Sequence, residues 1–493
     1  MTFEQLISLC QPIDVSGPEP NSIGTLTQDS RKVEEGSVFI AIKGFQVDGH
    51  LFIDDAIAQG ASVIICEDTY YTDQDVCVLE VEDTRALIGP LAQAFEGNPA
   101  EKLKLIGITG TNGKTTVATL TYQALQKLGA KPSLLGTVAK RIGDQEIESK
   151  LTTADPIELA ADMAQMVAAG STHLVMEVSS HALDQRRVDG VEFDVGAFTN
   201  LSHDHLDYHD DLKSYASSKK QLFDSLDPRA TAIINGDDKQ ASFIAMDCPS
   251  KIVDFSFKKA LEVECQVLSD NINGLVLRIA QTVIESPLVG TFNAYNLTEA
   301  FLICRALGYD DEAIANALES APGAAGRLER VAGSGKNDNP VVLVDYAHTP
   351  DALENVASTL ADIKAENQQL HIIFGCGGNR DKSKRAKMAK IAEQYGDKVT
   401  VTSDNPRDED PDAIIDEIMK GFAKADKVER LTNRKKAIQK AIDDGNAQTM
   451  VLIAGKGHET YQEINGKRHD FDDREIARQA LGHENDNENN EVT

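Results

Sequence analysis

The segment GITGTNGKTT at residues 107–116 constrains the fold of this chain more than any other. It follows an apolar run, residues 103–108, that has the composition of a buried strand. It precedes residues 117–128, whose apolar side chains recur at helical spacing. Glycines in such a turn let backbone N–H groups approach an anion, and the helix N-terminus adds positive potential. The order of strand, glycine-rich turn and helix therefore predicts a phosphate-binding loop in an α/β fold.

Two side chains at the end of this loop have the chemistry that a nucleoside triphosphate requires. We expect the Lys114 ammonium to reach the terminal phosphates and the Thr115 hydroxyl to ligate Mg²⁺. The loop departs from the common G-x-x-x-x-G-K-[ST] pattern, because Ile108 stands where the first glycine should be. The residues predicted to bind the phosphates of ATP or GTP are Gly110, Thr111, Asn112, Gly113, Lys114, Thr115 and Thr116.

The composition is that of a globular protein with several domains. At 493 residues the chain is too long for one core, so we expect about three domains. No run of about 18 apolar residues occurs, and we expect no membrane association. The first residues, MTFEQLISLCQPID, carry no basic cluster, and the seven cysteines are scattered without a C-x-x-C pair. These features favour reduced thiols and a cytoplasmic location.

The charge of the chain restricts its partners. A formal net charge of −30 argues against a nucleic-acid partner, because such a partner needs a basic face. Anionic ligands must instead be bound by loops, helix N-termini and single Arg or Lys residues. Part of the acidic excess lies in residues 483–493, which we expect to form a disordered tail.

Turns and linkers divide the chain into three α/β parts. The turn at 97–99 ends a first region of short apolar runs, and a glycine-rich stretch at 321–340 marks a second boundary. A β-rich patch at 261–289 turns at Asn273-Gly274 and is predicted to form hairpins. From residue 341 the alternation of strands and helices restarts as a separate doubly wound domain. The predicted parts are a small N-terminal domain at 1–100, a central P-loop parallel-sheet ATPase domain at 101–330, a C-terminal Rossmann-like domain at 331–482 and the tail at 483–493.

Further segments resemble one family over nearly the whole chain. They are DSRKVEEGSVFIAIKG (29–44), EVSSHALDQRRV (177–188), TNLSHDHLDYH (199–209), GTFNAYN (290–296), VDYAHTPDAL (344–353), FGCGGNRDKSKR (374–385), DNPR (404–407) and GKGHE (455–459). With the loop GTNGKT, they are similar in sequence and order to the Mur ligases, and most similar to the UDP-N-acetylmuramoyl-tripeptide synthetase branch that adds meso-diaminopimelate. The resemblance implies three domains, one each for a UDP-sugar, ATP and an amino acid.

The resemblance also implies an ATP-dependent amide ligation in peptidoglycan precursor synthesis. In that reaction ATP phosphorylates the D-glutamate carboxylate of UDP-N-acetylmuramoyl-L-alanyl-D-glutamate. An amine of meso-diaminopimelate then attacks the acyl phosphate, and phosphate leaves. Because a carboxylate and the γ-phosphate must meet, Mg²⁺ and lysine should dominate the catalysis. We expect the protein to be a monomer.

Four residues are expected to carry the catalysis. Lys114 would bind the terminal phosphates. Glu177 lies at a predicted strand end and matches the family's Mg²⁺ ligand. By resemblance His205 helps to hold a second Mg²⁺. Its cluster HDHLDYH also suggests zinc, but the alternation of His203 and His205 without a nearby cysteine disfavours zinc. Lys219 matches the lysine that CO₂ converts to a carbamate, which would turn a cation into a carboxylate-like Mg²⁺ ligand.

Other ligand contacts are implied by the resemblance alone. Asn296 would face the adenine, and Arg327 and Asp345 would reach ATP from the third domain. The residues that match the family's positions for the UDP-muramoyl-dipeptide are Ser30, Phe45, Gln46, Val47, Thr152, Thr153, Ser179, Gln185 and Arg187. Two alternatives stay open: the threonines at 152–153 could cap the following helix, and one of the arginines at 186–187 could be solvated.

The third domain decides which amino acid is added. The residues predicted to bind it are Arg380, Asp404, Asn405, Pro406, Arg407, Gly455 and Glu459, which lie beyond predicted strand ends. Diaminopimelate differs from lysine by a second carboxylate, which Arg407 could bind bidentately. With lysine bound, Arg407 would be left buried without an anion. Asp404 and Glu459 would take the distal ammonium group. A surface ion pair is the alternative for Arg407, and ligation of L-lysine is the alternative activity.

Two further classes of protein share part of this pattern. Folylpolyglutamate synthetase has a similar phosphate loop but lacks the DSR-type first domain and the DNPR motif. A module or switch that hydrolyses ATP without forming an amide would also need the loop. A simple kinase would have no use for a pocket of mixed charge in the third domain. Folylpolyglutamate synthetase and a kinase are therefore disfavoured, and the ATP-hydrolysing module stays a more remote alternative.

Overall fold

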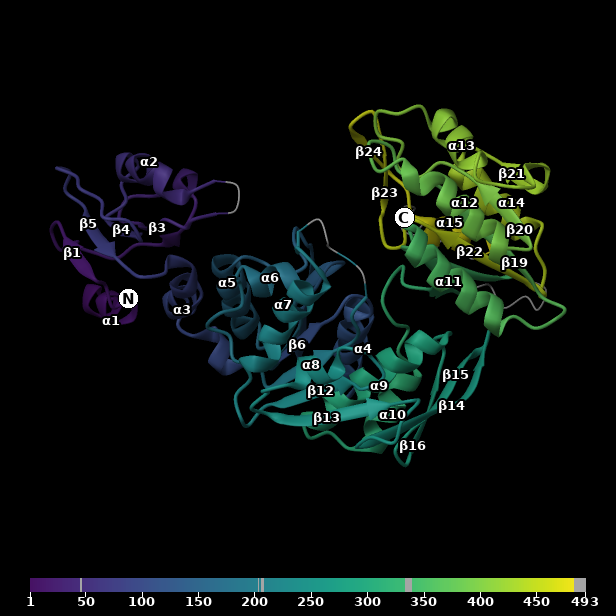
Figure 1. The fold of residues 1–493 in the computed structure, drawn as a ribbon, viewed down its shortest axis with the longest axis horizontal. Coiled ribbons are helices and arrows are strands. Elements are labelled where there is room, and N and C mark those ends of the chain that lie inside the picture. The colour runs from purple at the N-terminus through teal and green to yellow at the C-terminus, as the bar shows by residue number, and fades with distance from the viewer. Residues whose placement is uncertain (45–46, 203, 205–207, 333–338, 483–493) are drawn as a thin grey trace, which may run out of the picture. The chain divides into compact units, whose positions relative to one another are not determined.

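The computed structural model describes residues 1–44, 47–202, 204, 208–332 and 339–482. The chain forms two compact units, of residues 1–264 with 299–314 and of residues 265–298 with 315–493. Both consist of sheets covered by helices, which confirms the predicted α/β class (Figure 1). None of the described helices is long and apolar enough to cross a membrane.

The first part of the chain is a small α/β layer with a mostly parallel sheet. Its elements are α1 (Phe3–Cys10), β1 (Asp14–Ser16), β2 (Leu26–Thr27), β3 (Val38–Ile40), α2 (Ile53–Ala58), β4 (Val63–Cys66), β5 (Cys77–Glu80) and α3 (Thr84–Phe95). The strand order is β1-β5-β4-β3-β2, and only β1 is antiparallel. Leu91 of α3 and Ala160 of a later helix share one core with this sheet. The packing therefore joins this layer to the central part within the first unit.

The central part is built around the phosphate loop. Its elements are β6 (Lys104–Thr109), α4 (Lys114–Lys127), β7 (Pro132–Leu135), β8 (Ala139–Ile142), β9 (Gln145–Glu148), α5 (Pro156–Ala168), β10 (His173–Glu177), α6 (Ser180–Asp184), β11 (Val195–Phe198), α7 (Leu212–Asp224), β12 (Thr231–Asn235), α8 (Ala241–Ala245) and β13 (Lys251–Ser256). The strand β6 lies between β10 and β11 and is parallel to both. The carboxyl ends of these three strands therefore meet at one edge.

The predicted β-rich patch forms antiparallel hairpins. Its strands are β14 (Val263–Asn271), β15 (Gly274–Ile279) and β16 (Thr282–Ser286). The turn between β14 and β15 lies at Ile272-Asn273, one residue from the predicted position. Two helices follow, α9 (Thr291–Ala306) and α10 (Asp311–Glu319).

The last part contains a six-stranded sheet. Its elements are β17 (Glu329–Val331), β18 (Val341–Asp345), α11 (Pro350–Ile363), β19 (Gln369–Phe374), α12 (Ser383–Tyr395), β20 (Lys398–Val401), α13 (Pro411–Met419), β21 (Val428–Arg430), α14 (Arg434–Asp443), β22 (Thr449–Ala454), β23 (Tyr461–Ile464), β24 (Lys467–Asp470) and α15 (Asp473–Ala480). The strand order is β17-β18-β22-β19-β20-β21, with β23 and β24 as a separate hairpin. Residues 321–340 were predicted to form a linker. This prediction is wrong for residues 329–331, which form β17: the strand pairs with β18, and its Val331 is buried.

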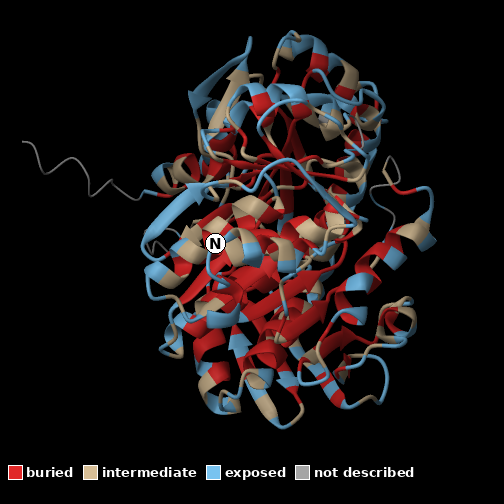
Figure 2. Ribbon diagram, turned by 90° about the vertical axis from the view of Figure 1, so that its left-hand side faces the viewer, coloured by how far each residue is buried: buried red, intermediate tan, exposed pale blue. Residues whose placement is uncertain are grey.

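Burial follows the layers of each sheet. The central strands are red in Figure 2, whereas the outer helix faces are largely exposed. In β18, β19 and β22 nearly every residue is buried, as expected for parallel strands covered on both faces. Polar side chains that act on a ligand must therefore lie beyond the strand ends.

One buried ion pair ties two helices to the end of β22. Arg434 of α14 donates from Nε and Nη2 to the Asp473 carboxylate at 2.8 and 2.7 Å, and both side chains are fully buried. Arg434 Nη2 also donates to the Ala454 carbonyl at 3.0 Å. This bidentate pair supports the backbone immediately before Gly455.

Replacing Asp473 should destabilise the second unit strongly. In Asp473→Ala the guanidinium would stay buried without its carboxylate, which costs about 3–5 kcal/mol. Urea unfolding followed by circular dichroism measures the shift. Asp412→Ala is the matched control, because Asp412 pairs with Arg430 in solvent and its loss should leave the midpoint unchanged. Equal shifts in the two variants would contradict this account.

Candidate active site

The loop between β6 and α4 is closed against the segment that follows β11. Gly110 has a φ of 148°, and a Cβ atom there would lie 1.9 Å from Thr199 Oγ1. Only glycine fits, because a side chain would meet both strain and a clash. The Asn112 N–H donates to Asn200 Oδ1 at 3.0 Å, and Thr199 Oγ1 donates to the Asn112 carbonyl at 2.6 Å. The neighbouring strand end therefore fixes the shape of the loop.

Two lysines converge on the Gly110 carbonyl. Lys114 Nζ donates to it at 2.9 Å and Lys219 Nζ at 2.8 Å. Lys219 is 1% exposed, and its Nζ lies 4.5 Å from the centre of the Tyr215 ring. Burial lowers the pKa of Lys219 well below its ordinary value, and the Lys114 cation lowers it further. The Lys219 amine is therefore biased toward its neutral form.

Glu177 ends β10 beside the first turn of α4. Thr115 Oγ1 donates to Glu177 Oε2 at 3.0 Å. Thr137 donates its backbone N–H to Oε1 at 2.8 Å and its hydroxyl to Oε2 at 3.2 Å. A Cβ atom on Gly136 would lie 2.4 Å from Oε1, so the carboxylate needs glycine at this position. The structure thus brings together two of the predicted Mg²⁺ ligands, Thr115 and Glu177, and Thr137 orients one of them.

The oxygen atoms of Thr115 and Glu177 fit Mg²⁺. This ion takes octahedral oxygen ligands at about 2.0–2.1 Å, typically one or two carboxylates with substrate phosphates, so adjacent ligands lie about 3.0 Å apart. That is the separation of Thr115 Oγ1 and Glu177 Oε2. No cluster of three or more His, Cys, Asp or Glu side chains suited to a metal occurs in the part of the chain that the structure describes. His205 and His203 lie outside the described residues.

Predicted contacts to the muramoyl-dipeptide lie beside Glu177. Thr152 Oγ1 is 3.0 Å from Thr137 Oγ1, and Thr153 Oγ1 donates to the Glu177 carbonyl at 2.8 Å. The Ser179 N–H donates to Thr153 Oγ1 at 3.1 Å. These hydroxyl groups therefore border the same strand end as the candidate Mg²⁺ ligands.

The threonines at 152–153 do not cap α5. Asp155 is the N-cap, because its carboxylate accepts the N–H groups of Ile157 and Glu158 at 3.0 and 3.1 Å. Ser179 in turn caps α6 and accepts the Ala182 N–H at 3.1 Å. The capping alternative for the threonine pair is therefore wrong.

The two neighbouring arginines at 186–187 have different partners. Arg187 donates from Nε to Gln185 Oε1 and from Nη1 to the Thr153 carbonyl, both at 3.0 Å. Burial lowers the pKa of Arg187. Arg186 is half-buried and pairs with Asp83 at 2.9 Å, so neither arginine is simply solvated. The oxygen atoms that hold Arg187 are neutral, which leaves its charge for an anion.

The predicted UDP-muramoyl-dipeptide contacts in the first part of the chain lie near β2 and β3. Ser30 is buried in a short 3₁₀ turn. Val47 is exposed, and its carbonyl accepts the Gly44 N–H at 3.1 Å. Phe45 and Gln46 lie outside the described residues.

The three residues expected to reach ATP from beyond the loop lie in the second unit. Asn296 is buried in α9 and donates to Asn293 Oδ1 at 2.9 Å. Asp345 accepts backbone N–H groups on both carboxylate oxygens, at 2.6 and 2.8 Å. The Arg327 guanidinium lies 5.0 Å from the centre of the Tyr346 ring, and its buried Nε has no hydrogen-bond partner among the described residues. Asp345 thus shapes the turn after β18, whereas Arg327 keeps an unused donor.

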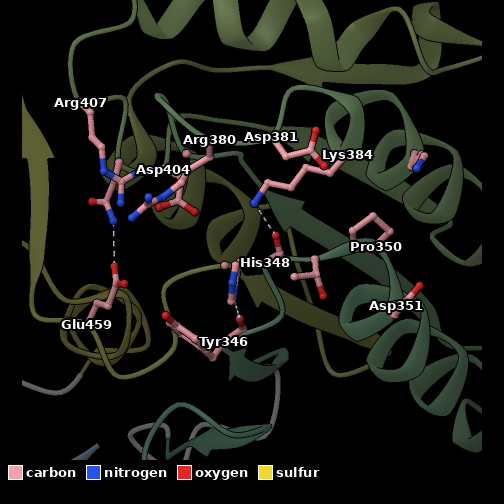
Figure 3. Close-up of a pocket in the computed structure, with 15 residues that line it drawn as sticks. Tyr346, His348, Pro350, Asp351, Arg380, Asp381, Lys384, Asp404, Arg407 and Glu459 are labelled. Atoms are coloured by element: carbon pink, nitrogen blue, oxygen red, sulfur yellow. Dashed lines mark hydrogen bonds between the residues drawn. The ribbon is translucent and has the colours of Figure 1, made fainter. Parts of the chain in front are cut away.

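A cavity of about 560 Å³ opens beyond the strand ends of the second unit (Figure 3). Of the residues predicted to bind the amino acid, all line it except Pro406. In Figure 3, Arg380, Asp404 and Arg407 lie at one end, and Pro350 and Asp351 lie at the other. The other lining residues, none of which was predicted to bind the amino acid, are Tyr346, His348, Thr349, Pro350, Asp351, Gly377, Asp381, Lys384 and Lys387.

The two predicted acidic residues of this cavity have different surroundings. Asp404 is 6% exposed, and its carboxylate accepts no hydrogen bond from the described residues. Glu459 Oε2 accepts from Asn405 Nδ2 at 2.9 Å and from Lys456 Nζ at 2.9 Å. Lys456 is fully buried and also donates to Asn405 Oδ1 at 3.1 Å. Asp404 therefore keeps its acceptors for a ligand, whereas Glu459 is fixed by a buried cation.

Arg407 has an anionic partner within the protein. Its Nε donates to Glu463 Oε2 at 3.1 Å, and its Nη1 donates to the Gly378 carbonyl at 2.9 Å. The side chain is 21% exposed. We expected Arg407 to be left without an anion when lysine is bound. This expectation is wrong, because Glu463 of β23 is an anionic partner that does not depend on the ligand.

Three residues that shape these sites were not predicted as site residues. Thr137 follows an apolar strand and gave no signal of its own. Lys456 lies inside GKGHE, where a buried cation beside an acidic residue could have been expected. Glu463 lies on a hairpin whose Asn465-Gly466 turn is a recognisable type I′ signal.

Family models match three successive stretches of the chain. They are the Mur ligase family, catalytic domain, at residues 22–96; the Mur ligase middle domain at 108–304; and the Mur ligase, glutamate ligase domain, at 326–457.

Relatives of known name or structure cover nearly the whole chain. A UDP-N-acetylmuramoyl-L-alanyl-D-glutamate–2,6-diaminopimelate ligase of Cytophaga hutchinsonii is 42% identical over 98% of this chain and 99% of its own length. A solved structure of a ligase with the same name is 31% identical, with a TM-score of 0.74 and 98% of each chain covered. A MurF ligase of Thermotoga maritima in complex with ADP shares the fold, at 18% identity, a TM-score of 0.57 and 87% and 93% coverage. The chain therefore belongs to the Mur ligase family.

Proposed function

We propose that this chain is an ATP-dependent ligase that joins 2,6-diaminopimelate to UDP-N-acetylmuramoyl-L-alanyl-D-glutamate, with release of ADP and phosphate. The meso isomer is the form that the sequence motifs favour. The names of the full-length relatives support this activity. Monomeric state, cytoplasmic location and the domain boundaries at 100 and 330 stay predictions from the sequence.

The observation that carries the proposal is the mixed charge of the cavity in the second unit. Arg380 and Arg407 present cations, and Asp404 presents a carboxylate that accepts no hydrogen bond from the described residues. Diaminopimelate carries both an ammonium and a carboxylate at its distal end, so one amino acid could pair with both the arginines and the Asp404 carboxylate. Charge-assisted hydrogen bonds of this kind are the strong ones in proteins.

The acceptor is proposed to bind in the first unit beside Glu177. Arg187 would pair with a carboxylate of the muramoyl-dipeptide, because the described oxygen atoms that accept its hydrogen bonds are neutral. The hydroxyl groups of Thr152, Thr153 and Ser179 would complete the contact. The N–H groups of the 110–113 loop and the Lys114 ammonium would orient the phosphates of ATP.

Mg²⁺ would be held by Thr115 and Glu177, and it would neutralise charge between the phosphates and the acceptor carboxylate. The protein itself contributes by holding the reacting groups in place. Thr137 fixes the Glu177 carboxylate, and the buried strand end excludes water from it. Asn296, Arg327 and Asp345 remain predicted contacts of the nucleotide.

A carbamate on Lys219 is part of the proposal. The neutral amine would attack CO₂, an N–C bond would form, and the amine proton would pass to solvent. Burial and the neighbouring Lys114 favour the neutral amine that this step needs. The product would place an anion near the Gly110 carbonyl, where the neutral amine had been.

Ligation of L-lysine is the second candidate, and one observation supports it. Because Glu463 already pairs with Arg407, a bound lysine would not leave this guanidinium without a partner. Product mass after incubation with ATP, the UDP-muramoyl-dipeptide and an equal mixture of lysine and diaminopimelate decides between them. We expect only the diaminopimelate product. A lysine adduct as the main product would overturn the amino-acid assignment, and ATP hydrolysis without any adduct would overturn the ligase assignment.

Removing the Arg407 side chain should weaken the use of diaminopimelate. Arg407→Ala should lower kcat/KM for it by about tenfold to a hundredfold, as expected for a lost charge-assisted pair. Arg430→Ala is the control, because Arg430 forms an exposed ion pair and does not line the cavity. Steady-state phosphate release measures both variants, and an unchanged Arg407→Ala would contradict the assignment.

Removing the Lys219 amine should abolish most of the activity, with partial rescue by a small carboxylate. Lys219→Ala should lose about a hundredfold or more in kcat, since several kcal/mol of charge stabilisation would disappear. Acetate or formate should restore part of the rate. Lys220→Ala is the matched control, because Lys220 pairs with Asp224 on the same helix. Full activity of Lys219→Ala, or the absence of a CO₂ adduct on Lys219 in the intact protein's mass, would count against the carbamate.

A further inference from the structure

Glu463 contacts Arg407 twice, through its side chain and through its backbone. Glu463 Oε2 accepts from Arg407 Nε at 3.1 Å. The Glu463 carbonyl accepts the Arg407 N–H at 3.0 Å. The Asn465 N–H donates to the Arg407 carbonyl at 2.8 Å, so β23 and its turn bind both sides of the Arg407 peptide.

These bonds hold Arg407 in an unusual backbone conformation. Its φ is 51°, a left-handed value that is uncommon for a residue with a long side chain. Such a conformation persists when surrounding contacts determine it, and here the β23–β24 hairpin supplies them. The Glu463 N–H also donates to Asn405 Oδ1 at 2.9 Å, which ties the same strand to the neighbouring cavity residue.

The contacts also select which donors of Arg407 face a ligand. Nε is taken by Glu463 and Nη1 by the Gly378 carbonyl. Nη2 has no partner among the described residues, and Arg407 lines the cavity. A guanidinium fixed at two of its three nitrogen atoms cannot rotate its remaining donors away from the cavity.

We infer that Glu463 is a positioning residue that sets the specificity of the cavity, by holding the Arg407 guanidinium ready for the distal carboxylate of the amino acid. This inference rests on the proposed function and deepens it. Glu463 itself is not among the residues that line the cavity. Glu463 acts through Arg407. Its oxygen atom is needed to accept the hydrogen bond from Arg407 Nε, whereas its negative charge is not needed.

The first test compares Glu463→Ala with Glu463→Gln. Glu463→Ala should raise KM for diaminopimelate by about tenfold, because Arg407 would lose its fixed orientation. KM for ATP and for the UDP-muramoyl-dipeptide should stay within about twofold, as should kcat. Glu463→Gln keeps an acceptor oxygen for Nε and should restore KM to within about threefold of the original. An unchanged KM in Glu463→Ala, or an equal rise in Glu463→Gln, would overturn the inference.

The second test asks whether Glu463 acts through Arg407. In an Arg407→Ala background, Glu463→Ala should change KM no further, because the group that it positions is absent. Independent, multiplying effects would overturn the inference. Glu475→Ala is the matched control, since Glu475 pairs with Arg478 on α15 and should leave every KM unchanged.

Failures of the two proposals are separable. If the unmodified chain forms no diaminopimelate adduct, the proposed function fails. If it forms the adduct but Glu463→Ala keeps its KM, only the positioning role fails. Should Glu463→Ala unfold, Glu463→Asp replaces it, because the shorter side chain cannot reach Nε and should raise KM in the same way.

Discussion

The convergence of two lysine side chains on one carbonyl, that of Gly110, organises the phosphate-loop end of the first unit. This convergence requires glycine at position 110, because Thr199 occupies the space that a Cβ atom would need. It also requires β6, α4 and α7 to meet at one strand end. Burial and the neighbouring Lys114 cation both lower the pKa of Lys219, so the neutral amine is favoured there. Lys114 is then the cation that this loop offers to phosphates, in a chain whose net charge is −30.

Much of this arrangement could be predicted because parallel strands align their carboxyl ends. The loop at 110–116 and Glu177 follow adjacent strands, so their meeting follows from topology alone. The same rule gathers Asp404 and Gly455 in the second unit. The burial of Lys219 in α7, beside Lys220, is a property of the packing that the sequence motif alone did not indicate.

Sequence motifs did not reveal the residues that orient other site residues. Thr137 orients Glu177 through its own backbone N–H, a group that every residue except proline carries and that no motif can mark. Glu463 reaches Arg407 only because a short hairpin folds back over the loop at 404–407. Its Asn-Gly turn was visible, but the partner of a hairpin is a matter of tertiary packing. The strand β17 was missed for a similar reason, since three residues are too few to show a period.

The partner of Arg407 changes how selectivity between two amino acids must be explained. An unpaired buried guanidinium would reject lysine by a penalty, whereas a guanidinium already paired with Glu463 imposes none. Selectivity then rests on what the second carboxylate adds: hydrogen bonds to donors that are already oriented and partly dehydrated. Such bonds contribute about 1.5–3 kcal/mol, which corresponds to about 10- to 150-fold in binding. A cavity built in this way favours one amino acid by attraction, and its selectivity depends on how rigidly β23 holds Arg407.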